Sequence, residues 1–263
     1  MGRVYTLVNQ KGGVGKTTTA INLGAYLALL GQRVLIVDID PQANATSSLG
    51  VDKHTVQGGM YEALLGGSPA AALVLLNPRL KLSILPSSPS LAGAEVELVN
   101  ELGRESKLKQ VLAPLVERYD YVLIDCPPSL GLLTVNGLMA AADGVLIPVQ
   151  CEYLALEGLG ELTRTVQRVR SALFPTLKVR GVILTMFDVR THLSGDVVAE
   201  VRKYFPREVF ETIIPRSVRL AEAPSYGLPV SAYAPDSQAA RSYEALAREL
   251  LKGDGVAVRE SMD

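Results

Sequence analysis

A glycine-rich stretch near the start of the chain carries the first residues that could do chemistry. The segment NQKGGVGKTT (residues 9–18) follows a short apolar run and precedes a helical pattern. Glycines let backbone N–H groups approach phosphate oxygens closely, and the start of the following helix favours an anion. Lys16 is placed to bind the β- and γ-phosphates of a nucleotide, and the Thr17 hydroxyl is placed to bind Mg²⁺. The segment predicts a phosphate-binding loop, although Gln10 stands where the usual pattern has glycine; the alternative is a glycine-rich turn with an incidental lysine.

Two apolar runs that end in aspartate supply a second group of candidates. VLIVDIDPQ (residues 34–42) contains Asp38 and Asp40, and YVLIDCPPS (residues 121–129) contains Asp125. Ligands of open α/β sheets bind at the carboxyl ends of the strands, where a carboxylate can orient Mg²⁺ through its water shell. Taken alone, each aspartate could also be a turn initiator. Two such strands beside a phosphate loop favour a magnesium–phosphate site.

The elements that position these residues alternate along the whole chain. Strands are expected at seven apolar runs, namely residues 4–8, 34–37, 80–85, 121–124, 145–149, 179–184 and 209–214, and helices at residues 16–30 and 159–173. Continuous apolar strands are typical of a parallel sheet that is buried on both faces. The order predicts an α/β fold with a doubly wound, mostly parallel sheet and helices on both faces. We expect one domain over residues 1–252 and a polar, flexible tail over residues 253–263.

Composition excludes several classes of protein. The chain has 263 residues, of which 48% are hydrophobic, with 26 basic and 27 acidic side chains, as in a globular protein. No apolar run approaches the roughly 20 residues of a membrane span, and the first residues lack a signal-peptide pattern, so a cytoplasmic protein is expected. Cys126 and Cys151 stand in no metal-ligand spacing, which favours buried thiols over a metal cluster.

Positive charge concentrates in one part of the sequence. Residues 164–219 carry 11 basic and five acidic side chains, a net charge of +6, although the formal net charge of the whole chain is -1. A one-sided basic surface could bind phosphate backbones without reading bases. Ordinary solvated helix faces are the alternative.

Several segments resemble one known family. KGGVGKTT, DIDPQ and LIDCPPS are similar to the deviant Walker A motif and the switch regions of the ParA/MinD family of P-loop ATPases. TMFDVRTHL and IPRSVRLAEAPSYGLPV resemble the C-terminal half of chromosomal ParA proteins, often called Soj, and the resemblance runs from about Arg3 to about Leu251. It implies a P-loop NTPase fold, with ATP and Mg²⁺ as cofactors.

The resemblance also implies roles for single residues. The catalytic group would be Lys11, Lys16 and Asp40, with Lys11 reaching the nucleotide of a second subunit and Asp40 positioning the attacking water. Thr17 and Asp125 would serve Mg²⁺, and Asp38 is a further candidate for the metal shell. The nucleotide-binding positions are Lys11, Gly12, Gly13, Val14, Gly15, Lys16, Thr17, Thr18, Pro215 and Arg216. Arginines at the places of Arg190 and Arg219 bind non-specific DNA in the family, and Arg216 and Lys203 are weaker candidates.

The function implied by this resemblance is ATP-dependent chromosome partitioning. An ATP-bound homodimer would bind double-stranded DNA non-specifically on the nucleoid, and a ParB-type centromere-binding partner would stimulate a weak ATPase and release the DNA. The end of the sequence lacks the basic amphipathic helix by which MinD relatives bind membranes, so no membrane partner is expected. The alternatives are a MinD-like positioning ATPase that acts on a membrane or protein cargo, and an iron–sulfur carrier.

Overall fold

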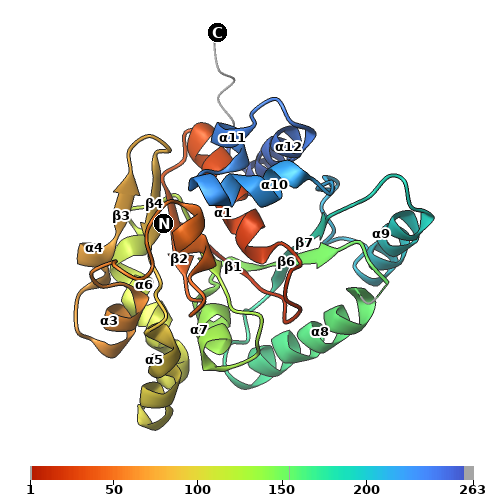
Figure 1. The fold of residues 1–263 in the computed structure, drawn as a ribbon. Coiled ribbons are helices and arrows are strands. Elements are labelled where there is room, and N and C mark those ends of the chain that lie inside the picture. Colours follow the sequence, from red (N-terminus) through yellow and green to blue (C-terminus); the bar gives the residue numbers. More distant parts are fainter. Residues whose placement is uncertain (1, 154, 258–263) are drawn as a thin grey trace.

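A seven-stranded sheet forms the centre of the molecule in the computed structural model, which describes residues 2–153 and 155–257. The strand order is β3-β4-β2-β5-β1-β6-β7 (Figure 1), and all neighbouring strands are parallel except β3 and β4. The strands are β1 (Arg3–Leu7), β2 (Val34–Asp38), β3 (Leu75–Asn77), β4 (Leu82–Leu85), β5 (Tyr121–Asp125), β6 (Gly144–Gln150) and β7 (Val179–Thr185). The predicted doubly wound, mostly parallel sheet is confirmed.

Helices cover both faces of this sheet. They are α1 (Lys16–Leu29), α2 (Asn44–Ser48), α3 (Met60–Leu65), α4 (Ala70–Leu73), α5 (Leu91–Glu97), α6 (Lys107–Val116), α7 (Leu132–Ala140), α8 (Ala155–Ala172), α9 (His192–Tyr204), α10 (Val218–Glu222), α11 (Val230–Tyr233) and α12 (Gln238–Gly253). Short 3₁₀ turns span Leu98–Asn100, Arg104–Ser106 and Ala223–Tyr226. Among the helices described here, none is both long enough and apolar enough to cross a bilayer.

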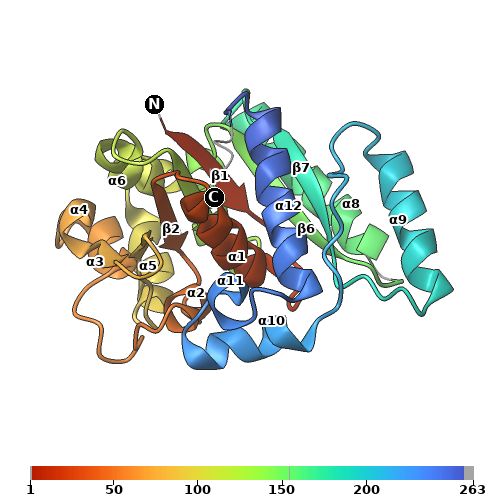
Figure 2. The same cartoon turned by 90° about the horizontal axis from the view of Figure 1, so that it is seen from above.

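Alternation along the central strands explains the two layers. In β5, Tyr121 and Leu123 join the core that contains α1 and α12, whereas Val122 and Ile124 join the core that contains α5 and α6. All five β5 residues are buried, as expected for a strand covered on both faces. Figure 2 shows α1 and α12 side by side over one face of the sheet, where they pack together. A third core lies between the β6–β7 side of the sheet and helices α8 and α9.

The predicted strand at residues 209–214 is wrong. This segment runs beside β7 and contacts it through one isolated bridge, between Val209 and Val182, with Phe210 N–H donating to the Val182 carbonyl at 3.0 Å. The amides of Glu211 and Thr212 instead donate to the carboxylate of Glu249 on α12, at 2.7 and 3.0 Å. The Glu249 side chain therefore accepts hydrogen bonds from two amides that would otherwise be available to a neighbouring strand. The edge strand β3 was not predicted, because three residues with two exposed leucines give no clear pattern.

The end of α12 is held by a buried carboxylate. The Asp254 side chain is 2% exposed and accepts hydrogen bonds from the hydroxyls of Tyr5 (2.9 Å) and Tyr121 (3.0 Å). The Arg180 guanidinium donates to the same carboxylate at 2.9 Å, and that of Arg3 lies 3.6 Å away. Asp254 is thus fixed to three strands of the sheet, although we expected it to belong to a flexible tail. Residues 258–263 of that expected tail lie outside the described residues.

Candidate active site

The phosphate-loop segment joins the carboxyl end of β1 to the start of α1. Gly13 and Gly15 adopt left-handed backbone angles (φ of 75° and 87°), which glycine adopts without steric cost. The side chain of Asn9 accepts a hydrogen bond from the Lys11 amide at 3.0 Å. From the other side of the loop, the Thr185 hydroxyl donates to the Val14 carbonyl at 2.8 Å. The loop is therefore held by a hydrogen bond within the segment and by one from the end of β7, in front of the positive end of α1.

Lys16 lies inside this loop. It is 6% exposed, and its ammonium donates to the Lys11 carbonyl at 3.2 Å. Burial lowers the pKa of Lys16, and the nearby charges of Asp125, Cys126 and Asp40 oppose that shift. A desolvated ammonium held by a carbonyl gains much from an incoming phosphate, because charge-assisted hydrogen bonds are about twice as strong as neutral ones.

The two carboxylate-bearing strands meet at the same edge of the sheet. Asp38 pairs in register with Asp125 across β2 and β5. The Thr17 hydroxyl donates to Oδ2 of Asp125 at 2.7 Å, while the buried Oδ1 of Asp125 has no hydrogen-bond partner among the described residues. Burial, together with the charge of Asp38, holds the pKa of Asp125 well above its usual range. An orphaned buried carboxylate oxygen is costly unless a cation or a donor reaches it.

This donor set fits Mg²⁺. Thr17 and Asp125 would hold the ion, which would supply positive charge beside the phosphates. Within the described part of the chain, no group of three or more histidine, cysteine, aspartate or glutamate side chains could hold a metal alone. Phosphate oxygens and water would therefore complete the coordination, as is usual for Mg²⁺ at nucleotide sites.

The carboxylate of Asp38, a further candidate for the metal shell, is held by protein donors. Its carboxylate accepts hydrogen bonds from the Thr46 amide (2.8 Å), the Thr46 hydroxyl (2.7 Å) and the Asp40 amide (3.1 Å). Burial raises the pKa of Asp38 to about 6, and these hydrogen bonds limit the rise. With both oxygens occupied by protein donors, Asp38 is suited to supporting the Asp40 loop rather than to joining the metal shell.

Asp40 faces a cavity above the phosphate loop. Its Oδ1 accepts a hydrogen bond from the Gln42 amide at 2.9 Å. The cavity measures about 380 Å³ and is lined by Gly12, Gly13, Gly15, Lys16, Thr17, Thr18, Asp40, Asn44, Ser48, Pro128 and Met186. The structure thus brings Lys16, Thr17 and Asp40 to one space, where an ammonium, a hydroxyl and a carboxylate all face the same cavity.

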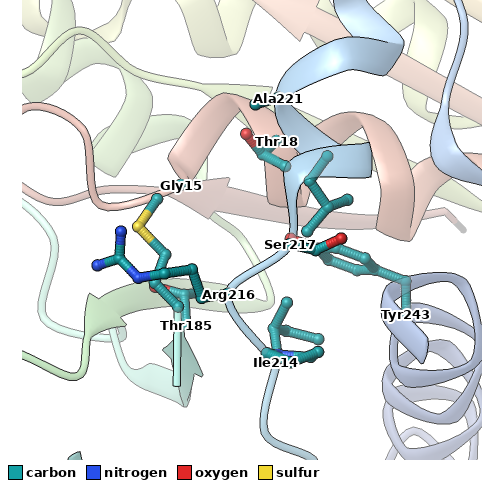
Figure 3. Close-up of a pocket in the computed structure, with 11 residues that line it drawn as sticks. Gly15, Thr18, Thr185, Ile214, Arg216, Ser217, Ala221 and Tyr243 are labelled. Atoms are coloured by element: carbon teal, nitrogen blue, oxygen red, sulfur yellow. The ribbon is translucent and has the colours of Figure 1, made fainter. Parts of the chain in front are cut away.

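A second, more apolar pocket adjoins this cavity (Figure 3). It measures about 230 Å³ and is lined by Gly15, Thr18, Thr185, Met186, Ile214, Pro215, Arg216, Ser217, Leu220, Ala221 and Tyr243. Both spaces share Gly15, Thr18 and Met186, so a nucleotide could place its base in one and its phosphates in the other. The Tyr243 hydroxyl lies 3.1 Å from that of Thr19 on α1, which fixes this wall to the loop helix.

Several lining residues escaped the sequence reasoning. Pro215 and Arg216, which the resemblance gave as nucleotide-binding positions, are among the lining residues. Tyr243 was not expected there, because its position in an amphipathic helix indicates only a core residue. Met186 has a left-handed backbone (φ of 53°), which no local pattern signals. Lysines and glycines of the loop are recognisable in a sequence, whereas the apolar walls of a base pocket are not.

Lys11 lies at the rim of the site. Its ammonium is 3.8 Å from Oε2 of Glu152, and Arg216 donates to Oε1 of the same carboxylate at 3.2 Å. The Lys11 side chain is 34% exposed, in contrast to the buried Lys16. The Glu152 carboxylate therefore contacts both the first lysine of the loop and Arg216 of the more apolar pocket.

The four basic side chains expected to bind DNA lie on separate elements. Arg190 precedes α9, Lys203 lies in its last turn, Arg219 lies on α10, and Arg216 lines the base pocket. All four side chains are more than half exposed. Each forms an ion pair with a carboxylate, in the order given those of Asp188, Glu200, Glu222 and Glu152. The four cations are accessible, and two of them, Arg190 and Arg216, lie close enough to Asp188 for both charges to lower the pKa of its carboxyl.

Comparisons with known proteins show the family. A family described as an AAA domain matches residues 2–179. The chromosome partitioning protein ParA of Myxococcus xanthus is 54% identical over 97% of this chain and 89% of its own length. The sporulation initiation inhibitor protein Soj of Bacillus subtilis is 51% identical over 95% of this chain and 98% of its own. The chain belongs to the ParA/Soj family of chromosome-partitioning ATPases.

A solved structure extends the comparison to the ligands. Cobyrinic acid a,c-diamide synthase of Mycobacterium smegmatis, with a bound ATP analogue and magnesium, is 40% identical and has a TM-score of 0.85. The likeness covers 97% of this chain and 96% of that one. As a ParA/Soj-family protein, the chain is an ATPase with a P-loop fold that uses ATP and Mg²⁺, and its relatives support a role in chromosome partitioning.

Proposed function

We propose that this ParA/Soj-family ATPase is a switch in which ATP joins two subunits, and the dimer binds DNA non-specifically on the nucleoid. The proposal rests mainly on the different positions of Lys16 and Lys11. Lys16 is buried in the phosphate loop of its own chain, whereas Lys11 lies at the rim beside Glu152 and is partly exposed. A partly exposed cation at the rim of the site, held only by a long ion pair, could turn to the nucleotide of a second subunit.

DNA binding would use the exposed basic side chains on and before α9 and α10. Arg190, Lys203 and Arg219 each pair with a carboxylate, and water screens such exposed pairs, so they are weak. A phosphate backbone can therefore displace the carboxylates, with the salt dependence of counterion release. ATP can drive this binding only if the dimer has a higher DNA affinity than the monomer.

Hydrolysis would use Lys16 and Asp40. Lys16 neutralises developing phosphate charge, and Asp40 positions the attacking water, since phosphoryl transfer depends mainly on positioning and charge. Among the described residues that line the phosphate cavity, none is an arginine. We therefore propose a slow basal reaction that a ParB-type partner accelerates, which separates the subunits and releases DNA.

The decisive experiment measures mass in solution for Asp40→Ala with ATP, with ADP and without nucleotide, each with and without duplex DNA. The expected result is a dimer only with ATP, and stable DNA binding only by that dimer. Lys16→Ala is the control that should lose nucleotide binding altogether. A monomer at saturating ATP would overturn the proposal, and so would equal DNA affinity of the ATP and ADP forms. Anionic vesicles replace DNA in a final arm, and binding to them alone would favour a positioning ATPase with a membrane cargo.

A further inference from the structure

A buried hydrogen-bond network lies behind the Asp40 loop. The carboxylate of Asp38, at the end of β2, accepts from the amide and hydroxyl of Thr46 on α2. The Thr46 hydroxyl in turn accepts from the Ser87 amide at 2.9 Å, two residues beyond the end of β4. All three residues are fully buried. The network therefore joins three separate elements of the fold through side chains that solvent does not reach.

The network closes on the main chain of Asp40 from both sides. The Asp40 amide donates to Oδ1 of Asp38 at 3.1 Å, and the Asp40 carbonyl accepts from the Ser87 hydroxyl at 2.8 Å. The same carbonyl also accepts from the Ala43 amide at 2.8 Å. The backbone of Asp40 is thus fixed at both of its polar groups, while its side chain lines the phosphate cavity.

Backbone strain occurs within the same loop. Ala43, just before α2, has left-handed angles (φ of 51° and ψ of 42°) although it is not glycine, and it is fully buried. This conformation costs about 1–3 kcal/mol and persists only where the surrounding structure enforces it. The hydrogen bonds of Asp38, Thr46 and Ser87 hold the loop in this conformation. Strain of this kind concentrates at functional sites, where it fixes a geometry in advance.

We propose that Thr46 and Ser87, acting with Asp38, are positioning residues that hold Asp40 in the geometry required for ATP hydrolysis. None of the three is among the residues that line the phosphate cavity, and they act through the main chain of Asp40. The inference rests on the catalytic role proposed above for Asp40. The network would then affect the rate of hydrolysis as well as stability, because a shift of about 1 Å in a positioned group can lower the rate by about 100-fold.

The central test compares Thr46→Val with Thr46→Ser. Valine keeps the shape of threonine but removes the hydroxyl that bonds Asp38 and Ser87, whereas serine retains the hydroxyl. In steady-state hydrolysis we expect Thr46→Val to lose about 10- to 100-fold in kcat with little change in KM for ATP, and Thr46→Ser to keep a kcat near that of the wild type. Hydrogen exchange gives a second readout, in which the amides of Asp40, Gln42 and Thr46 should exchange faster in Thr46→Val alone.

Thr6→Val is the matched control. Thr6 is equally buried, and its hydroxyl donates to the Gly137 carbonyl at 2.7 Å, outside the network. Equal losses of kcat in Thr6→Val and Thr46→Val would show a general stability effect and would overturn the inference. If Thr46→Val does not fold, Ser87→Ala carries the same test, because it removes only the hydroxyl that holds the Asp40 carbonyl.

Asp40→Ala distinguishes the catalytic role of Asp40 from the positioning role of Thr46 and Ser87. Wild-type turnover in Thr46→Val or Ser87→Ala, with Asp40→Ala inactive, would overturn the positioning role and leave the proposed function standing. Wild-type turnover in Asp40→Ala would remove the catalytic role of Asp40 and the inference with it. Loss of kcat, retained KM and rescue by serine would support both.

Discussion

The ammonium of Lys11 lies 3.8 Å from the Glu152 carboxylate, at the rim of the nucleotide site rather than within the phosphate loop. We expect Lys11→Ala to keep ATP binding by the single subunit, because the buried Lys16 remains, and to lose the ATP-dependent dimer. Titration with a fluorescent ATP analogue measures the first property, and light scattering at saturating ATP measures the second. A dimer of normal stability in Lys11→Ala would remove the cross-subunit role of this lysine.

The hydrogen bond from Thr17 to Asp125 leads to a prediction about magnesium. Thr17→Val removes both the hydroxyl that would bind Mg²⁺ and the donor that orients Asp125. We expect the affinity for Mg²⁺ in the presence of ATP to fall by about 10- to 100-fold, as is typical when the support of a metal site is lost. The measurement is ATP affinity over a series of Mg²⁺ concentrations, with EDTA as the metal-free reference. Unchanged magnesium dependence would contradict the assignment of Thr17.

Arg219 on α10 tests the DNA-binding surface. Arg219→Glu should lose DNA affinity while keeping the ATP dimer, because the side chain is exposed and its ion pair with Glu222 lies away from the phosphate cavity. The slope of affinity against salt concentration should also become shallower. Arg248→Glu is the matched control, since Arg248 forms a similar exposed pair with Glu244 on α12. Equal effects of the two substitutions would exclude a specific role for Arg219.

The two thiols should be unreactive in the native protein. Cys126 is fully buried, and Cys151 is nearly so. Burial raises the pKa of Cys126 well above its usual range and that of Cys151 to about 11. At pH 8 a thiol with that pKa is only about 0.1% thiolate, and the thiolate is the reactive form. Titration with a disulfide reagent should detect both thiols only after denaturation, and anaerobic absorbance should show no iron–sulfur band. Such a band would revive the carrier alternative.

Because of Asp254, the free energy of unfolding should depend on pH in the alkaline range. Burial and the charge of Asp254 raise the pKa values of Tyr5 and Tyr121 above their ordinary value of 10.0. The unfolded chain releases these protons first as the pH rises, so the stabilisation is complete below pH 10 and is lost progressively above it. Denaturant titrations from pH 8 to 11 should show the free energy of unfolding falling above pH 10.

Asp254→Asn checks the source of this effect. At neutral pH we expect a loss of about 2–3 kcal/mol, because the partly buried Arg180 guanidinium loses its charged acceptor. Above pH 10 the decline should be weaker than in wild type, since the charge that disfavours the phenolates is gone. Asp120→Asn, at the exposed pair with Arg33, is a control expected to cost less than about 1 kcal/mol. An equally steep decline in Asp254→Asn would leave burial alone as the cause.

Local patterns explain what the sequence predicts correctly. The glycine-rich segment before Lys16 and the aspartates at the ends of two apolar strands can each be recognised from a few consecutive residues. Parallel pairing of the strands then places Asp38 beside Asp125. Contacts between distant residues have no such signal. The Glu211 amide donates to Glu249 where a strand was expected. The hydrogen bond from Thr46 to Asp38 holds that carboxylate behind the Asp40 loop. Both depend on side chains that meet only after the helices have packed.

The wall of the base pocket formed by Tyr243 has a consequence for how the protein is made. The ribosome delivers the phosphate loop among the first residues and α12 after every strand of the described sheet. A nascent chain that still lacks α12 has the anion site but neither Tyr243 nor its bond to Thr19. The pocket beside the phosphate loop is therefore complete only after α12 has packed against α1.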